Sequence, residues 1–296
     1  MSNSLQGRVA FVTGAGRGIG RAAAAALARE EAIVTAVSRT AGEIADTVRQ
    51  IQEAGGQAVC FQADVADYES ISAVVEQVLD KYGRIDILVN NAGIQAPIGP
   101  LVTNDWQAWA ANIGVNLIGT FNCCHAVLPG MIKRKAGKII NFSGGGATGP
   151  RPNFSAYAAA KAAVVRLTET LAEEVKEHNI QVNAIAPGAV NTRMLDEVLQ
   201  AGDMAGAEWT AAQKRQDAGG VPPELAARLL AFLASDSANG LTGKLIAAPY
   251  DDWAGWSEET MVELSTTSWL TLRRIDPFTM NSVASGGSEN DIATKI

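Results

Sequence analysis

"VAFVTGAGRGIGRAAAAALA" occupies residues 9–28 and decides the fold: an apolar run leads into a glycine-rich turn, and an alanine-rich helical stretch follows. A glycine turn between a strand and a helix lets backbone N–H groups and the helix N-terminus face a pyrophosphate. The spacing from Thr13 to Gly20 fits T-G-x-x-x-G-x-G rather than G-x-G-x-x-G, because Ile19 stands where a third glycine would be. We predict a dinucleotide site here, although a glycine turn without a ligand would show the same pattern. Its residues are Gly14, Arg17, Gly18, Ile19 and Gly20.

Short apolar runs alternate with helical patterns along most of the chain. The apolar residues of each run are consecutive, as expected for strands covered on both faces. We therefore predict an α/β fold of the Rossmann type, with a doubly wound, seven-stranded parallel sheet in a three-layer α/β/α arrangement. Strands are expected at 8–13, 32–38, 58–63, 86–90, 138–143, 181–185 and 244–247, and helices at 19–29, 42–54, 68–82, 105–134, 155–177 and 223–234.

One domain, residues 1–248, is expected to hold both the dinucleotide site and the catalytic residues, with a substrate loop at 188–221. Residues 249–296 form a tryptophan-rich C-terminal extension, in which Ser257 is expected to start a short helix. The Gly/Ser-rich stretch from Asn281 on is expected to be disordered. The extension packs over the substrate loop or a neighbouring subunit, or else it covers ordinary apolar surface, and the sequence leaves these alternatives open.

Composition excludes several classes of function. Of the 296 residues, 47% are hydrophobic and 19% charged, and the formal net charge is -7. An acidic chain without a basic run is a poor candidate for binding nucleic acid or an anionic membrane surface. The N-terminus has no signal-peptide pattern and no apolar run approaches the length of a membrane span, so a cytoplasmic protein is expected. Cys60, Cys123 and Cys124 are expected to be buried reduced thiols, and no metal site is predicted.

The end of the second expected strand bears on the choice of cofactor. A carboxylate there would bind the ribose 2′-hydroxyl of NAD and repel a 2′-phosphate. Ser38 occupies that position and Arg39 follows it, while Arg17 lies inside the glycine turn. Two guanidiniums suit a phosphate dianion, so NADP(H) is predicted in preference to NAD(H). The alternative is that both arginines simply face solvent.

Two later segments are expected to complete the cofactor site. Asp64 and Val65 follow the third expected strand, where an adenine could be met. "NNAG", residues 90–93, ends the fourth strand and offers small residues for a close backbone approach. From it we expect contacts by Asn91, Ala92 and Gly93.

Tyr157 and Lys161 lie four residues apart on an expected helix, so they share one face. A free phenol has a pKa near ~10 and is a poor base at neutral pH. A nearby ammonium favours the phenolate, as does an oxidised nicotinamide. The pair could therefore exchange a proton with a carbinol or carbonyl oxygen while a hydride moves to or from the nicotinamide.

With these pieces in order, the chain resembles a short-chain dehydrogenase/reductase of the single-domain, NADP-preferring type. The resemblance covers residues 5 to 247 and rests on "TGAGRGIG", Asp64, "NNAG", Asn116 in "VNLIGTF", "YAAAK" and "PGAVNT". It implies that Tyr157 is the acid/base, that Lys161 holds the ribose and lowers the pKa of Tyr157, and that Asn116 fixes a water in a proton relay. It also implies a homo-tetramer or homo-dimer, and contacts to the nicotinamide end from Pro187, Gly188, Val190 and Thr192.

The catalytic serine departs from the family pattern. The family normally places it one position nearer the tyrosine than Ser143, and without a gap that position is Gly144. A shift of one residue along a strand turns a side chain to the opposite face. Either a bulge turns Ser143 inward, or the substrate oxygen is held by Tyr157 and another donor, such as Thr148 or Ser155. We favour Ser143 and count it among the catalytic residues.

Two functions of different classes fit the sequence. The favoured one is an NADP(H)-dependent oxidoreductase that interconverts a carbonyl and a secondary alcohol. The alternative is a non-catalytic NADP(H)-binding regulator or scaffold, against which the presence of both Tyr157 and Lys161 argues. An epimerase or dehydratase would require a different glycine spacing and a larger C-terminal substrate domain.

Overall fold

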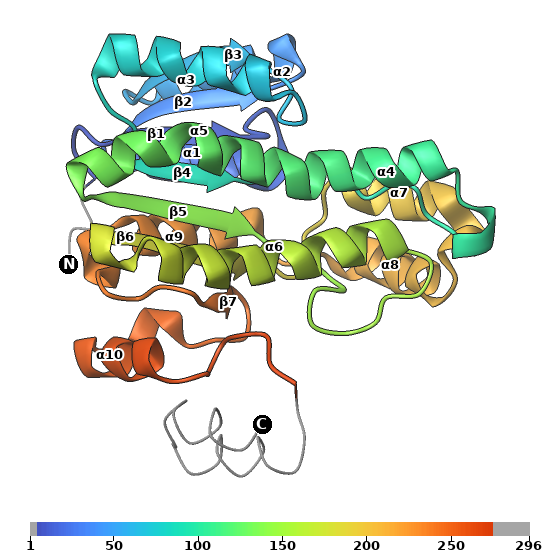
Figure 1. Ribbon diagram of the computed structural model, residues 1–296. Coiled ribbons are helices and arrows are strands. Elements are labelled where there is room, and N and C mark those ends of the chain that lie inside the picture. The colour runs from blue at the N-terminus through green and yellow to red at the C-terminus, as the bar shows by residue number, and fades with distance from the viewer. Residues whose placement is uncertain (1–4, 275–296) are drawn as a thin grey trace.

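A computed structural model of the chain describes residues 5–274 (Figure 1). One parallel sheet lies at its centre, with its strands in the order β3-β2-β1-β4-β5-β6-β7. This confirms the predicted seven-stranded, doubly wound sheet. The strands are β1 (Val9–Thr13), β2 (Ile33–Ser38), β3 (Gln57–Gln62), β4 (Ile87–Asn90), β5 (Gly137–Phe142), β6 (Ile180–Ala186) and β7 (Leu245–Ala247).

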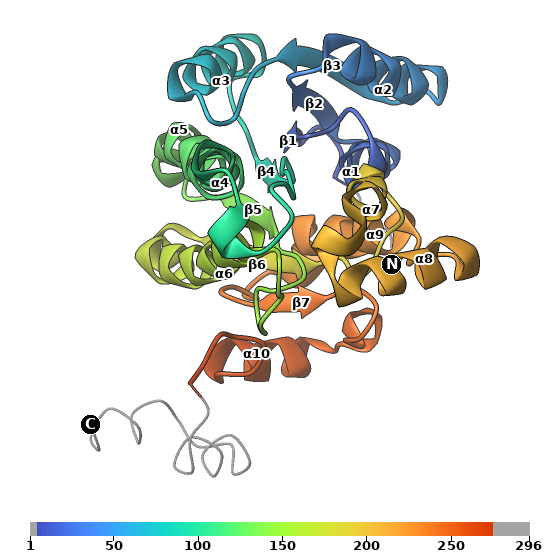
Figure 2. The same cartoon turned by 90° about the vertical axis from the view of Figure 1, so that its right-hand side faces the viewer.

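Helices cover both faces of the sheet, which makes the three layers visible in Figure 2. One face is covered by α1 (Gly18–Arg29), α2 (Ala41–Glu53) and α9 (Pro223–Ala234). The other is covered by α3 (Tyr68–Tyr82), α5 (Gly119–Arg134) and α6 (Ser155–Glu174). Every residue of β1 and β4 is therefore buried, which explains why these runs are apolar without alternation.

The order of the strands places a crevice at the centre of the sheet. The chain adds β2 and β3 on one side of β1, and then adds β4 on the other side. The connections after β1 and β4 therefore leave in opposite directions, and a crevice opens at the carboxyl ends of these strands. Ligands of open α/β sheets bind at such a switch point.

A long rod runs beside the sheet where the sequence predicts one helix over 105–134. It consists of α4 (Trp106–Ile113), a π-helical turn (Gly114–Ile118) and α5. Asp105 caps its start by accepting a hydrogen bond from Ala108 N at 2.7 Å. The π-turn contains Asn116, and insertions of this kind occur often at functional sites.

The same rod bears on the expectation that no run approaches the length of a membrane span. Trp106–Arg134 is long and apolar enough for a span by length and composition, since an 18-residue window of it has a mean hydropathy of 1.3. Half of that window is buried inside the fold, as in a core helix of a globular domain. Its apolar residues are thus explained in good part by packing against α3, α6 and the sheet.

The predicted substrate loop contains two helices, α7 (Arg193–Ala201) and α8 (Ala207–Ala218). They enclose a small apolar cluster in which Leu195 and Val198 pack with Phe154. Figure 1 shows both helices beside the start of α6, beyond the carboxyl ends of the strands.

The segment after β7 follows the outer edge of that strand. Ser257 caps α10 (Glu258–Thr266) by accepting a hydrogen bond from Thr260 N at 3.2 Å, as the sequence indicates. Leu245 N donates to Leu270 O at 2.7 Å, so the segment pairs with the edge of β7. Trp253 packs against Phe232 of α9 with ring centroids 6.0 Å apart. The expected disorder from residue 281 on lies outside the described residues.

One expectation about the cysteines was wrong. Cys123 and Cys124 are buried, and burial raises the pKa of the Cys124 thiol to about 12. Cys60, however, is exposed. It lies on β3, the edge strand, where alternate side chains face away from the core.

Candidate active site

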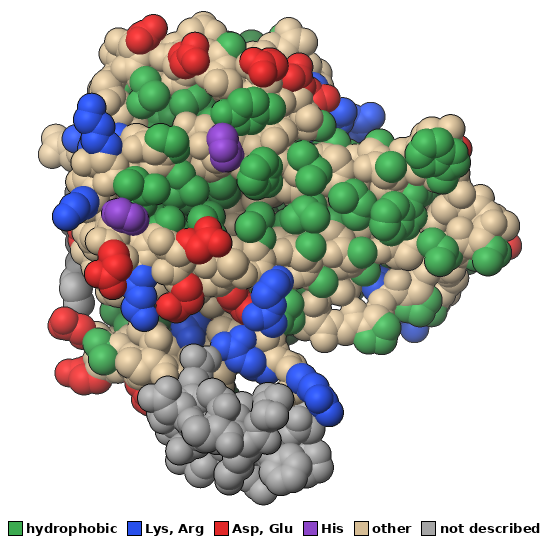
Figure 3. Space-filling model, in the orientation of Figure 1, with side chains coloured by type: hydrophobic (Ala, Val, Ile, Leu, Met, Phe, Trp, Pro, Cys, Tyr) green, Lys and Arg blue, Asp and Glu red, His purple; other side chains and the backbone are tan. Residues whose placement is uncertain are grey.

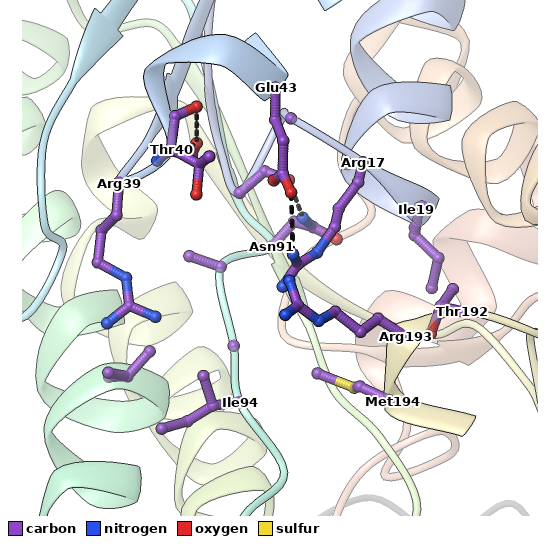
Figure 4. A pocket seen from close by; sticks show the side chains of 18 of the residues that line it. Arg17, Ile19, Arg39, Thr40, Glu43, Asn91, Ile94, Thr192, Arg193 and Met194 are labelled. Carbon is purple, nitrogen blue, oxygen red and sulfur yellow. Dashed lines mark hydrogen bonds and ion pairs between the residues drawn. The ribbon is translucent and has the colours of Figure 1, made fainter. Parts of the chain in front are cut away.

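A cleft of about 370 Å³ opens at the carboxyl ends of β1, β2 and β4 (Figure 4). The residues that the sequence assigns to the phosphate and adenosine parts of the cofactor all line it. They are Gly14, Arg17, Gly18, Ile19, Gly20, Ser38, Arg39, Asp64, Val65, Asn91, Ala92 and Gly93, joined by Thr192 from the substrate loop.

The glycine turn is shaped by its close contact with the end of β4. Gly14 has φ +64, and a Cβ there would lie 2.8 Å from Asn91 Nδ2. A Cβ on Gly20 would lie 2.1 Å from the Gly14 carbonyl oxygen. Asn91 Nδ2 donates to the carbonyls of Thr13 and Gly14, at 3.1 and 3.2 Å. The turn therefore presents its backbone to the cleft at the start of α1, which fits a pyrophosphate.

Arg17 and Arg39, the two arginines expected to bind the 2′-phosphate of the cofactor, each have an acidic partner. Arg17 pairs with Glu43 of α2 at 3.1 Å, and Arg39 lies 3.8 Å from Asp64. Glu43 was not predicted as a site residue, although its position in the first turn of α2, shortly after Ser38 and Arg39, places it near the same end of the sheet. The other lining residues that were missed are Gly16, Thr40, Ala63, Ile94, Val115, Asn191, Arg193, Met194 and Glu197.

Tyr157 and Lys161 lie in the first turns of α6 and are both buried. Lys161 Nζ lies 5.7 Å from the centroid of the Tyr157 ring and donates to Phe142 O at 2.9 Å. Burial lowers the pKa of Lys161 to about 8 and raises the pKa of Tyr157 to about 12, while Arg151 acts to lower the latter. An ammonium has three donors, so Lys161 can also reach the hydroxyls of a ribose.

Asn116 is anchored through its amide nitrogen and leaves its oxygen free. Nδ2 donates to Ile94 O at 2.8 Å and to Asn112 O at 3.1 Å. Oδ1 is buried and makes no hydrogen bond within the described part of the chain. A Cβ on Gly93 would lie 2.7 Å from this oxygen and 3.6 Å from Lys161 Nζ. Asn116 and Lys161 thus meet beside the cleft, at an acceptor suited to a bound water.

Ser143 and its neighbour Gly144 have different surroundings in the structure. Ser143 N donates to Ile185 O at 2.8 Å, which continues the β5–β6 pairing, and Ser143 Oγ is buried with no hydrogen-bond partner among residues 5–274. Gly144 instead faces the phenol of Tyr157, because a Cβ there would lie 2.2 Å from the Tyr157 hydroxyl oxygen. Of the two alternative donors, Ser155 accepts a hydrogen bond from Trp109 Nε1 at 3.0 Å and Thr148 is exposed.

The segment after β6 closes over the glycine turn. Gly188 has φ +80, and Val190 is buried. Thr192 reaches across the cleft, since its Cγ2 would lie 3.1 Å from a Cβ on Gly18. Pro187, Gly188 and Val190 are not among the residues that line the cleft. Within residues 5–274, no three His, Cys, Asp or Glu side chains gather as they would around a metal ion.

Sequence comparison places these residues in a known family. A family model described as short chain dehydrogenase matches residues 8–202. The chain belongs to the short-chain dehydrogenase family. This short-chain dehydrogenase is 38% identical over 242 residues to the 3-oxoacyl-(acyl-carrier-protein) reductase FabG of Thermotoga maritima, and the match covers 82% of this chain and 96% of that protein.

Solved structures agree with the assignment. NAD+-bound xylitol dehydrogenase superposes with a TM-score of 0.76 at 29% identity, over 82% of this short-chain dehydrogenase and 97% of that chain. A variant actinorhodin polyketide ketoreductase with NADPH superposes with a TM-score of 0.76 at 30% identity, over 83% and 96%. The protein is therefore an oxidoreductase that acts on alcohol and carbonyl groups with a nicotinamide cofactor.

Proposed function

We propose that the enzyme is an NADP(H)-dependent oxidoreductase that interconverts a ketone and a secondary alcohol, with Tyr157 as its acid/base. The observation that carries the proposal is the burial of Tyr157 and Lys161 on one face of α6, where Lys161 Nζ lies 3.6 Å from the position of a Cβ on Gly93, a residue that lines the cleft. The cofactor, when bound, supplies or accepts the hydride.

The chain's own residues handle the proton. In reduction Tyr157 donates its phenolic proton to the substrate oxygen, and in oxidation it takes that proton back. Burial holds the pKa of Tyr157 high. We propose that the Lys161 ammonium, on the same face of α6, favours the phenolate against this effect. The free Oδ1 of Asn116 can hold a water that returns protons to this pair.

Ser143 remains our candidate for the donor to the substrate oxygen, because its buried Oγ has no partner among the described residues and because it precedes Gly144, which faces the Tyr157 hydroxyl. We expect Ser143→Ala to lower kcat by about 10²- to 10³-fold, the usual cost of losing such a donor. Steady-state kinetics would measure it, with Thr148→Ala and Ser155→Ala assayed in parallel. Turnover near that of the wild type would mean that Gly144 holds the serine position and that the donor lies elsewhere.

The preference for NADP(H) is proposed from Ser38 and Arg39, since no carboxylate ends β2. We expect Arg39→Ala to raise KM for NADPH by roughly 10- to 100-fold, the loss of a charge-assisted hydrogen bond to phosphate, and to leave KM for NADH nearly unchanged. Arg49→Ala is the matched control, because Arg49 is an exposed arginine of α2 paired with Glu53. Equal effects on both cofactors would contradict the proposal.

We also propose that the enzyme works in the cytoplasm as a homo-dimer or homo-tetramer. Figure 3 shows apolar side chains spread over one face of the molecule. The apolar residues exposed on the α4–α5 rod include Trp106, Ile118 and Phe121. Light scattering after gel filtration would measure the assembly.

Turnover itself decides between the enzyme and a non-catalytic NADP(H)-binding regulator. The wild-type protein is incubated with NADPH and a panel of ketones, and with NADP and a panel of secondary alcohols. The absorbance of reduced nicotinamide should fall in the first series and rise in the second. Tight NADPH binding without any absorbance change across both panels would favour the regulator.

A further inference from the structure

Arg151 lies on the β5–α6 loop beside the acid/base residue, and its side chain is only 13% exposed. Its guanidinium carbon lies 3.9 Å from the centroid of the Phe154 ring and 5.7 Å from that of Tyr157. A guanidinium in such positions is attracted by the faces of aromatic rings. Arg151 is therefore held beside the phenol.

Two partners fix the guanidinium from the other side. Arg151 Nη2 donates to Glu208 Oε2 at 3.0 Å, and Nη1 donates to Gln95 Oε1 at 3.4 Å. Glu208 belongs to α8, while Gln95 is buried and donates to Met194 O at 3.4 Å. Arg151 thus links the surroundings of Tyr157 to the substrate loop, and Glu208 stands behind it as a counter-charge.

Few other charges face Tyr157. Lys161 on the same helix has Nζ 5.7 Å from the ring centroid, and the loop after β5 places the uncharged Gly144 against the hydroxyl. Charged residues of the neighbouring cleft pair with one another: Arg17 with Glu43 at 3.1 Å, and Arg39 with Asp64 at 3.8 Å. Among the described residues, Lys161 and Arg151 are therefore the two cations that lie against the ring of Tyr157.

These two cations differ in how they respond to pH. Burial lowers the pKa of Lys161 to about 8, so its charge fades in the alkaline range where a tyrosine base is needed. A guanidinium keeps its charge throughout that range. Arg151 also lowers the pKa of Tyr157 against the effect of burial. The guanidinium of Arg151 therefore still stabilises a negative Tyr157 oxygen at pH values where Lys161 has lost its charge.

We propose that Arg151 is a positioning residue for the acid/base step: its guanidinium stabilises negative charge on the Tyr157 oxygen, and Glu208 sets how strongly it does so. The proposal rests on the proposed function of Tyr157. It adds a second cation to the lysine that the sequence predicts, and it gives a carboxylate of the substrate loop an influence on the proton transfer.

The test is the pH profile of kcat for alcohol oxidation, whose rising limb reports the ionisation of the base in the enzyme–substrate complex. Arg151→Gln should move that limb to higher pH by about one unit, as expected for removing a charge at this range in a partly screened site. Arg151→Lys keeps the positive charge, so its limb should lie close to that of the wild type. Glu208→Gln removes the counter-charge and should move the limb the other way, to lower pH.

The opposite directions of the pH shifts expected for Arg151→Gln and Glu208→Gln distinguish an electrostatic role of Arg151 from a structural one. Arg151→Gln and Glu208→Gln both break the same link between the β5–α6 loop and α8, so a purely structural role would change both variants in the same direction. Arg49→Gln serves as the control for removing an exposed arginine, and NADPH fluorescence checks that each variant still folds. A limb that moves the same way in both variants, or in neither, overturns the role of Arg151 and leaves the proposed function standing. A wild-type enzyme without turnover, or full turnover in Tyr157→Phe, removes both proposals.

Discussion

Replacing Tyr157 by phenylalanine is expected to lower kcat by about 10²- to 10⁴-fold, the usual contribution of a positioned general acid or base. The substitution removes only the hydroxyl, and the ring would keep its place on α6 and its neighbour Arg151. The variant should therefore fold and bind NADPH as the wild type does. Steady-state kinetics at saturating cofactor measures the loss, and the fluorescence of bound NADPH measures the affinity.

Tyr250→Phe is the matched control for this variant, because Tyr250 is 82% exposed and lies far along the chain after β7. It should behave as the wild type in both measurements. If Tyr157→Phe turned over substrate at the wild-type rate with the same affinity for NADPH, Tyr157 could not be the acid/base. A loss of turnover accompanied by loss of binding would instead point to a damaged cofactor site.

The fold could be predicted because its determinants are local and repeated. The apolar run of β1 and the glycine turn after it identify the switch point, and α3 and α9 begin and end where the periodicity places them. The π-turn around Asn116 could not be predicted, because it changes the hydrogen bonding of a helix without changing its apolar pattern. The exposure of Cys60 follows from strand order, which a single sequence does not state.

The two ends of the site also differ in how far the sequence predicts them. The phosphate end depends on two short motifs of adjacent residues, the glycine turn and "NNAG", so its glycines and Asn91 could be named in advance. The surroundings of Tyr157 depend on contacts between segments far apart in sequence. Arg151 and Glu208 are 57 residues apart, and no motif joins them. Arg151 lies between two prolines just before α6, which could have drawn attention to it, but nothing distinguishes Glu208 from the other acidic residue of α8.

Substituting Gly144 by alanine is expected to lower kcat by about 10²-fold or more, since a misplacement of about 1 Å at the reacting groups can cost that much. A Cβ there would lie 2.2 Å from the Tyr157 hydroxyl oxygen and 3.0 Å from its Cζ. The backbone of Gly144 has no positive φ, so alanine is allowed by conformation and the contact alone should act. The ring of Tyr157 must therefore move away from the substrate. Gly144→Ser, which carries the same Cβ, should not restore activity.

The adjacent glycines supply the controls for Gly144→Ala. A Cβ on Gly145 would make only ordinary contacts with Arg151, at 3.7 Å, so Gly145→Ala should stay close to wild type. Gly146 has φ +92 and would place a Cβ 2.7 Å from that of Ala158, so Gly146→Ala should lower the melting temperature. Removing the Tyr157 hydroxyl relieves the closest contact, so Tyr157→Phe should recover part of any stability lost in Gly144→Ala. Wild-type turnover in Gly144→Ala would show that the working enzyme does not hold its phenol against this glycine.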